Sequence, residues 1–155
     1  ETFTLNGSGT YTTTQTFLRV FRAYITGSSA PAGNISIANG GTTYAQITAG
    51  ENQTLMAVYT VPAGKSLYVY QGITTHGTGT SGGVYMTVRF LVRNPGEVFR
   101  TAVKIDVSES EILYPFVHPL KIPEKSDVEV RAICNKNQAN AISASFDGII
   151  VEESL

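Results

Sequence analysis

From Glu51 onward the chain reads as a series of short strand segments, one every 10–15 residues, separated by Gly, Pro or Asn turn signals. No segment in this stretch has a convincing helical period. Short strands at such regular spacing are typical of antiparallel sandwiches and barrels. Seven are expected, at Thr54–Val61, Ser66–Thr74, Val84–Arg93, Val98–Val107, Ile112–Val117, Asp127–Cys134 and Ala141–Val151.

A weaker eighth candidate, Thr43–Thr48, brings the number of strands to that of a jelly roll with two four-stranded sheets face to face. The strongest local prediction is a hairpin, because Asn94-Pro95-Gly96 joins two alternating strands. On the strand after the turn Pro62–Lys65, we expect Leu67, Val69 and Ile73 to face the core. The sequence therefore predicts an all-β fold, an antiparallel jelly-roll sandwich of about eight strands over residues 51–155. An extended N-terminal arm with partial strands precedes it over residues 1–50.

The arm has an unusual charge distribution, since no charged side chain occurs between Ala23 and Gly50. One interpretation is a flexible Gly/Ser-type linker. The other is a surface covered by another subunit, and apolar side chains at strand-like spacing favour it. We expect a strand at Thr16–Thr26 and two weak strands around the turn Asn39-Gly40-Gly41. The predicted subunit-interface residues are Phe17, Phe21, Tyr24, Ile25, Ile35 and Tyr44.

Residue patterns for catalysis are weak. The run Gly79-Thr80-Ser81-Gly82-Gly83 matches G-x-S-x-G, but it lies between two expected strands with no helix following, so a flexible loop is the better interpretation. His76 and His118 are isolated, and both are expected at partly exposed loop ends. The single Cys134 excludes an intrachain disulfide and a multi-cysteine metal site, and its strand parity predicts a buried thiol.

Three acidic pairs occur, namely Glu109/Glu111, Asp127/Glu129 and Glu152/Glu153. Asp127 and Glu129 alternate with core valines, so these acidic positions are interpreted as solvated. A loop calcium site built from them is the alternative. The sequence therefore predicts a protein that is not an enzyme and needs no cofactor.

Net charge and hydropathy limit the partners. A formal net charge of −1 without basic clusters predicts no nucleic-acid partner, and the lack of an 18-residue apolar run predicts no membrane partner. Tyr68 and Tyr70 share a strand parity and, with Tyr85, are a candidate surface for stacking against a sugar. The alternative is that they are ordinary tyrosines on a half-buried sheet.

Four segments carry a family resemblance: Asn52–Lys65, Arg93–Thr101, Ile122–Ala132 and Ala144–Glu152. With their strand–turn patterns, such as Val61-Pro62-Ala63-Gly64-Lys65 and Arg93-Asn94-Pro95-Gly96, the chain resembles small jelly-roll virion proteins of tailed bacteriophages over roughly residues 50–152.

The resemblance implies a component of the virion surface that decorates or cements a capsid. Its partners would be a major capsid protein and other copies of itself, as a trimer. It does not distinguish head from tail. The alternative is therefore a tail receptor-binding or carbohydrate-binding β-sandwich module that uses the three tyrosines and the Gly-rich loop.

Overall fold

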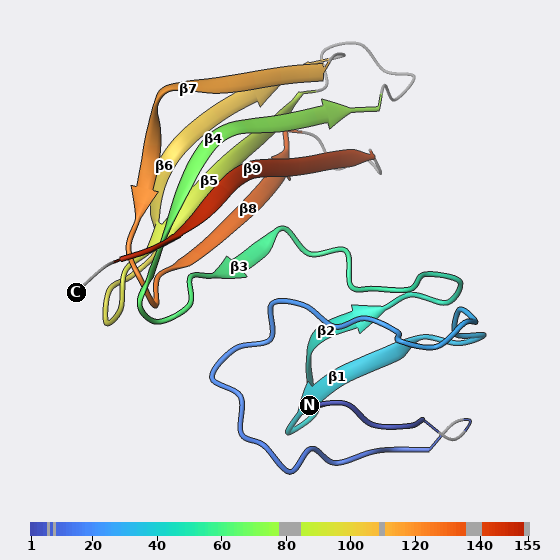
Figure 1. The fold of residues 1–155 in the computed structure, drawn as a ribbon. Coiled ribbons are helices and arrows are strands. Elements are labelled where there is room, and N and C mark those ends of the chain that lie inside the picture. Colours follow the sequence, from blue (N-terminus) through green and yellow to red (C-terminus); the bar gives the residue numbers. More distant parts are fainter. Residues whose placement is uncertain (6, 8, 78–84, 109–110, 136–140, 154–155) are drawn as a thin grey trace. The chain divides into compact units, whose positions relative to one another are not determined.

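The structure is a computed structural model that describes residues 1–5, 7, 9–77, 85–108, 111–135 and 141–153 (Figure 1). Within these ranges every regular element is a β-strand and every strand pair is antiparallel, which confirms the all-β prediction. The chain divides into two compact units, Glu1–Thr54 and Leu55–Leu155, called unit 1 and unit 2 below.

Unit 1 contains a hairpin formed by β1 (Ile35–Asn39) and β2 (Thr42–Ile47). Its two-residue turn needs positive φ at both positions, and Gly40 and Gly41 supply φ values of 57° and 82°. The predicted turn is thus confirmed. The strand expected at Thr43–Thr48 exists as β2, but it pairs with β1 in a separate two-stranded sheet and belongs to neither sheet of unit 2.

The segment Thr16–Thr26 does not form the expected strand. Only Tyr24 makes a β-bridge, to Gln53, and the flanking main-chain bonds join Ile25 to Asn52 and Thr54 to Ala23. A strand needs a neighbour along its whole length to satisfy its N–H and C=O groups. Within the described part of unit 1, only this short contact is provided.

Unit 2 is a β-sandwich with sheets of four and three strands (Figure 1). The first sheet has the order β3 (Val58–Thr60), β8 (Asp127–Cys134), β5 (Met86–Arg93) and β6 (Arg100–Val107). The second has the order β7 (Glu111–Ile122), β4 (Lys65–His76) and β9 (Ile142–Glu152). Each of the seven segments predicted after Glu51 overlaps one of these strands, although β4 and β7 extend beyond the predicted bounds at both ends and β9 lies one residue further along.

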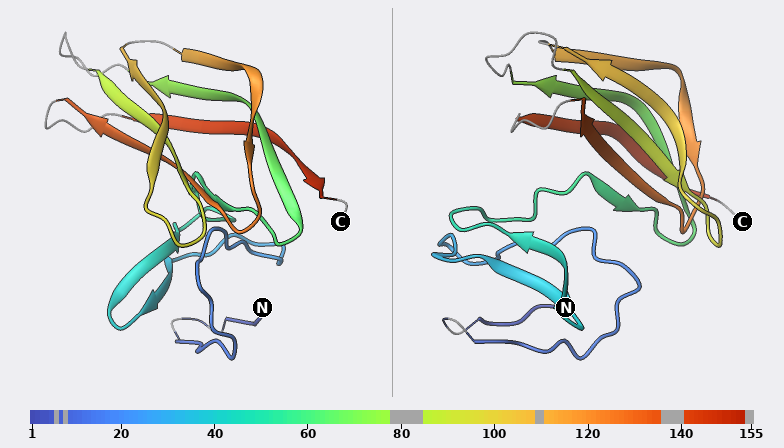
Figure 2. Two further views of the ribbon diagram at one scale, coloured as in Figure 1. Left: turned by 90° about the vertical axis from the view of Figure 1, so that its left-hand side faces the viewer. Right: turned by 180° about the vertical axis from the view of Figure 1, so that it is seen from behind.

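The core of unit 2 lies between the two sheets. Leu67 and Val69 from β4 join Phe90 from β5 and Val128 from β8 in one buried cluster. Phe146 on β9 packs edge-on against Phe90, with ring centroids 5.5 Å apart. Because the cluster takes side chains from both sheets, it holds the layers together. The two views of Figure 2 show these layers from other sides.

The chain winds between the sheets. Among the connections between consecutive strands of unit 2, only the β5–β6 hairpin stays within one sheet. This predicted hairpin is confirmed, with Glu97 N–H donating to Asn94 C=O at 3.0 Å and Gly96 at φ 78°. Outside it, β4 pairs with β7 and β3 pairs with β8, so the strand pairs are nested one inside the next.

A bulge in β4 changes which side chains face the core. The register of β4 against both neighbours shifts between Val69 and Gln71. Because side chains alternate with a period of two, one extra residue reverses the inward parity. After the bulge, Thr74 and His76 are buried, whereas Ile73 lies on the opposite face. The inward assignment of Ile73 and the partly exposed position expected for His76, which is 6% exposed, were therefore wrong.

The edge strand β7 is longer than predicted. It pairs with β4 through Glu111–Pro115 and again through Leu120–Ile122, while residues 116–119 between them have no partner in β4. The prediction ended this strand at Val117, which lies between Pro115 and Pro119. Proline is tolerated on an edge strand because its missing N–H faces away from the sheet, so the strand resumes beyond Pro119.

Candidate interaction surfaces

The described part of unit 1 exposes most of its large apolar side chains. Phe17, Leu18, Tyr24 and Tyr44 are between 49% and 104% exposed, and Phe21 is 37% exposed. The buried apolar residues of this unit are Ala45 and Ile47 on β2. A 54-residue unit with so little enclosed apolar surface gains little from its own hydrophobic packing.

The predicted interface residues fall into two groups. Phe17, Phe21, Tyr24 and Tyr44 are exposed, whereas Ile25 and Ile35 are half-buried. Tyr24 also has the Arg22 guanidinium 5.4 Å from its ring centroid. Their role at a subunit interface stays a prediction.

The three candidate ligand-binding tyrosines are divided between the two sheets of unit 2. Tyr68 and Tyr70 are on β4, where Lys121 Nζ lies 5.7 Å from the Tyr68 ring centroid and Tyr70, at the bulge, is 41% exposed. Tyr85 precedes β5 in the other sheet, is 43% exposed and donates its main-chain N–H to Asn135 Oδ1. Their ability to bind a ligand stays a prediction.

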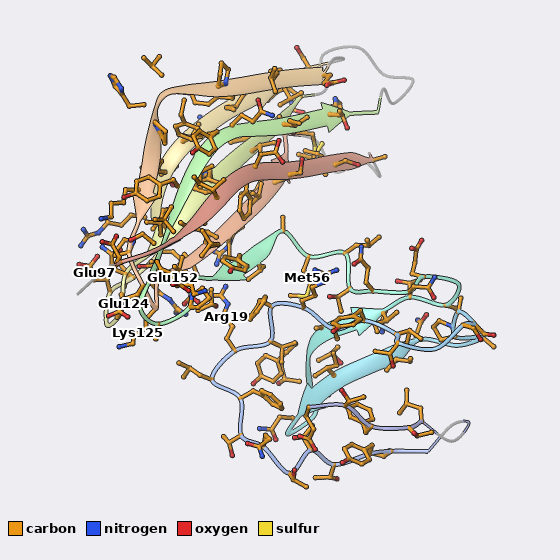
Figure 3. All side chains as sticks on the ribbon, in the orientation of Figure 1. Arg19, Met56, Glu97, Glu124, Lys125 and Glu152 are labelled. Carbon is orange, nitrogen blue, oxygen red and sulfur yellow. The ribbon has the colours of Figure 1, made fainter. Side chains whose placement is uncertain are left out.

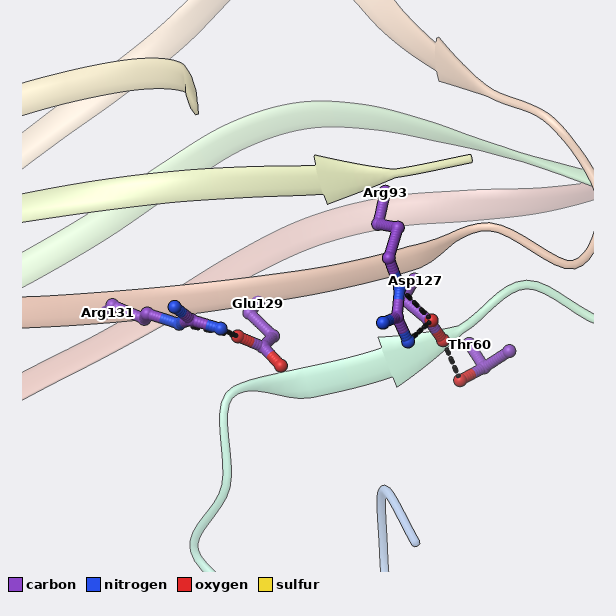
Figure 4. A network of polar contacts seen from close by, with 5 residues as sticks. All are labelled: Thr60, Arg93, Asp127, Glu129 and Arg131. Atoms are coloured by element: carbon purple, nitrogen blue, oxygen red, sulfur yellow. Dashed lines mark hydrogen bonds and ion pairs between the residues drawn. The ribbon is translucent and has the colours of Figure 1, made fainter. Parts of the chain in front are cut away.

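A polar network crosses three strands of the four-stranded sheet (Figure 4). Asp127 on β8 accepts hydrogen bonds from Thr60 Oγ1 at 2.6 Å and from Arg93 Nε at 3.0 Å, and its side chain is 11% exposed. Phe99 lies near two guanidinium groups, those of Arg93 at 4.6 Å and Arg131 at 5.1 Å. Sequence reasoning placed Asp127 in solvent. The structure corrects this, because strand partners on both sides supply its hydrogen-bond donors.

The partners of Asp127 assign it a structural role. A carboxylate that already accepts bonds from an arginine and a hydroxyl group holds neighbouring strands in register. The adjacent pair Arg131–Glu129 is bonded similarly, with Nε 2.6 Å from Oε2. Both members of the predicted acidic pair are therefore engaged with arginines.

Charged side chains gather at the end of unit 2 where β4 begins and β9 ends. Figure 3 shows Glu97, Glu124, Lys125 and Glu152 there. Glu124 Oε2 accepts the Gly64 N–H at 2.6 Å, and this bond, followed by the charge of Lys125, lowers the pKa of the Glu124 carboxyl.

At the same end, Lys121 Nζ lies 2.7 Å from Glu153. The hydrogen bond from Lys121, followed by one from Ser66, lowers the pKa of Glu153. These contacts hold the residue that follows β9 against β7 and β4.

The remaining chemical candidates are dispersed. His76 is buried near the end of β4, and its two ring nitrogens have no hydrogen-bond partner among the described residues. His118 is exposed in the part of β7 that has no partner in β4, and Cys134 is half-buried rather than fully buried. Ser81 of the G-x-S-x-G run and Glu109 of the first acidic pair lie outside the described residues.

Space for a ligand inside the sandwich is small. A cavity of about 30 Å³ lies between the sheets, lined mainly by core side chains such as Val69, Phe90 and Phe146. It has room for about one water molecule. Within the described ranges, no three His, Cys, Asp or Glu residues are grouped so that they could hold a metal ion.

Comparison with known proteins gives no further assignment: no family model, curated protein or solved structure matches the chain. The described residues contain no helix that is long and apolar enough to cross a bilayer. The class of protein defined so far is an all-β protein with a sandwich unit and an apolar, poorly enclosed unit 1.

Proposed function

We propose that this protein is a non-enzymatic structural component of a bacteriophage virion. It decorates or cements the capsid surface as a trimer and contacts a major capsid protein. The observation that carries the proposal is the exposure of apolar side chains in unit 1, together with the lack of charge between Ala23 and Gly50. Extended segments of this kind become ordered when other chains cover them.

The proposal includes a jelly-roll fold for unit 2. In an eight-stranded jelly roll, strands 1-8-3-6 form one sheet and strands 2-7-4-5 form the other. If β3 to β9 are taken as strands 2 to 8, the orders β3-β8-β5-β6 and β7-β4-β9 match this scheme, and none of the described residues forms a strand at the position of strand 1 beside β9. This match and the resemblance of residues 50–152 to virion proteins support the proposal.

Electron microscopy of purified phage particles tests the location. We expect density for unit 2 on the head, repeated around threefold positions. A protein missing from the particles would contradict the proposal. Density only at the tail tip would favour the receptor-binding alternative.

A binding assay tests the role of unit 1. Particles stripped of the protein should recover the full-length chain in co-sedimentation but not a variant that lacks residues 1–30. A second variant keeps the length of the chain and replaces Phe17, Phe21, Tyr24 and Tyr44 by serine. It should also fail to be recovered if the apolar side chains make the contact. Equal recovery of all three proteins would show that unit 1 is only a linker.

A glycan-binding module is the second candidate, and the exposure of Tyr70 and Tyr85 favours it. Its test is a glycan array with the single variants Tyr70→Ala and Tyr85→Ala. Because the two residues lie on different sheets, a single sugar site should lose its signal with one variant and keep it with the other. No signal from the unsubstituted protein would remove this candidate.

A further inference from the structure

The outward face of the four-stranded sheet carries a row of cations. On β5, Val88 and Phe90 are buried in the core, so the exposed Arg89 between them points away from it. Arg89 lies directly opposite Arg131 on β8 and directly opposite Lys104 on β6. Residues that face each other in this way share one face of the sheet, with Cβ atoms about 4.5–5.5 Å apart. The three side chains, called the cation row below, therefore cross three adjacent strands in register.

The cation row works against the stability of the sheet. Like charges directly opposite each other on neighbouring strands are destabilising. The chain has 11 lysines and arginines among 155 residues, so the grouping of three in one row is not a consequence of their abundance. Arrangements that oppose stability in this way are expected at sites that serve binding.

The three cations differ in how far carboxylates of the chain occupy them. Arg131 donates from Nε to Glu129 Oε2 at 2.6 Å (Figure 4). Lys104 Nζ lies 3.7 Å from Asp106 Oδ2, and the two side chains are 55% and 52% exposed, so this contact is weak. Arg89 has no hydrogen bond or ion pair with any described residue. The middle of the cation row therefore offers a guanidinium group whose N–H donors are available to a ligand.

The neighbours of the cation row define the ligand that fits. A guanidinium group binds an oxyanion, such as a carboxylate or a phosphate, through paired hydrogen bonds. Asp106 and Glu129 are each two positions from a member of the row and share its face. An extended anionic surface such as nucleic acid would also place negative charge over these two carboxylates. A protein segment with one or two acidic side chains can meet the row without that repulsion.

Few carboxylates of the chain itself remain to occupy the cation row. Among the described acidic side chains, only Glu51 and Glu111 have no hydrogen bond or ion pair. Glu111 lies on β7 in the other sheet, where it is paired with Thr75. Glu51 belongs to unit 1 and is included in the tests below.

We propose that the cation row is a docking site for an acidic protein segment, and that a carboxylate of this segment binds Arg89 between Arg131 and Lys104. The inference rests on the proposed function, since it names the chemistry of the particle surface that unit 2 contacts. Binding relieves the repulsion within the row. Because the row is exposed to solvent, the contact weakens as the ionic strength rises.

Fluorescence anisotropy with a labelled oligoglutamate peptide tests the cation row on the purified full-length protein. We expect binding at low ionic strength that is lost as salt is added. Arg89→Gln should weaken it about tenfold, because charge-assisted hydrogen bonds are lost. The matched control is Arg100→Gln, which removes the same charge from the same sheet at a position opposite Val92 and outside the row. Equal affinities of the two variants, or no binding by the unsubstituted protein, would overturn the proposal.

Two further arms of the same assay test the choice of ligand. Single-stranded DNA with as many charges as the peptide should bind more weakly than the peptide, and tighter binding of DNA would overturn the assignment to a protein partner. Glu51→Gln should bind the peptide as Glu111→Gln does, since each variant removes one unpaired carboxylate. A gain in affinity with Glu51→Gln alone would show that unit 1 occupies the row, and it would overturn the proposal.

Thermal unfolding separates a docking residue from a structural one. Because Arg89 faces two cations and has no partner among the described residues, Arg89→Gln should keep or raise the melting temperature. Arg131→Gln leaves Glu129, whose side chain is 15% exposed, without its arginine and should lower it. A fall with Arg89→Gln would reveal a structural role for this guanidinium group and would contradict the proposal.

Co-sedimentation with stripped phage particles separates the docking site from the proposed function. At low ionic strength, we expect less Arg89→Gln protein than Arg100→Gln protein to be recovered with the particles. Equal recovery of the two variants would overturn the docking site and leave the proposed function in place. If the unsubstituted protein is not recovered although it binds the peptide, the proposed function fails, and the particle is excluded as the source of the acidic segment.

Discussion

Gly148 on β9 lies where the strand approaches β4 too closely for any side chain. A Cβ atom at this position would lie 2.7 Å from the Tyr68 carbonyl oxygen and 2.8 Å from Leu67 Cδ1. Gly72 on β4 faces the same interior, but a Cβ there would meet only the Ser145 carbonyl oxygen, at 3.9 Å. The two glycines therefore form a matched pair within one ladder.

The expected effects have opposite signs. Gly148→Ala forces main-chain atoms of β4 and β9 apart, and overpacking of this kind costs about 1–3 kcal/mol. Gly72→Ala meets no obstacle and restricts the unfolded chain, which stabilises by about 0.4–1 kcal/mol. For a domain of roughly 100 residues, a loss of about 2 kcal/mol lowers the melting temperature by roughly 8–16 °C.

Urea unfolding followed by far-UV circular dichroism measures both variants, since the chain has no tryptophan. We expect the midpoint of Gly148→Ala to fall and that of Gly72→Ala to stay or rise. Equal midpoints would refute the close approach of β9 to β4. A fall with Gly72→Ala alone would mean that the two strands are paired in another register.

Three further variants test the polar interior and the charged end of unit 2. Asp127→Asn removes the charge that Arg93 contacts and should destabilise by about 1–2 kcal/mol in urea unfolding, a value reduced because that arginine is partly exposed; no change would mean that the pair is solvated. His76→Phe replaces a buried ring without a partner in the described residues and should raise the melting temperature, by about 1 kcal/mol of stability, whereas a fall would reveal a partner for the imidazole. Lys121 is the main cause of the lowered pKa of Glu153, so the ionised carboxylate stabilises the fold above its ordinary pKa of 4.5, and this stability is lost as the pH falls through the lower pKa of the folded state. Glu153→Gln should therefore reduce the fall of the melting temperature at acid pH. An equal fall in the variant and the unsubstituted protein would exclude this linkage.

The sequence predicted the strands of unit 2 because their patterns are local. Alternating side chains and the turn Asn94-Pro95-Gly96 depend on neighbours a few residues away, so the β5–β6 hairpin was predicted correctly. The nested pairing of β3 with β8 joins residues about 70 positions apart, and no local pattern encodes it.

Where the prediction failed, tertiary contacts decided the outcome. The bulge at Tyr70 reverses the inward parity of β4, so Thr74 and His76 are buried although strict alternation from Leu67 and Val69 places them on the outward face. Asp127 was assigned to solvent because its partners Arg93 and Thr60 come from two other strands. For Thr16–Thr26, the pattern indicates the capacity to form a strand but not whether a neighbour is present.

The interaction surfaces were predictable only as residue types. Tyr24 and Tyr44 lie in the uncharged stretch between Ala23 and Gly50, and both are exposed, whereas Phe17 and Phe21 lie beside Arg19 and Arg22. The edge position of β9 could not be predicted, because an edge is defined by the order of strands in a sheet. A strand such as Ile142–Glu152 has the same alternation at an edge as in the middle.

The winding of the chain between sheets has a consequence for how the protein folds. The central strand β4 pairs with β7 and β9, which follow it by tens of residues, and Lys65 meets Glu152 at a separation of 87 positions. Such distant pairings make folding slow compared with helical domains, on a scale of roughly milliseconds to seconds. During synthesis, β4 emerges well before either neighbour, so both of its edges stay unpaired until the later strands leave the ribosome. The chain is therefore most prone to mispairing with other nascent copies before β9 has been made.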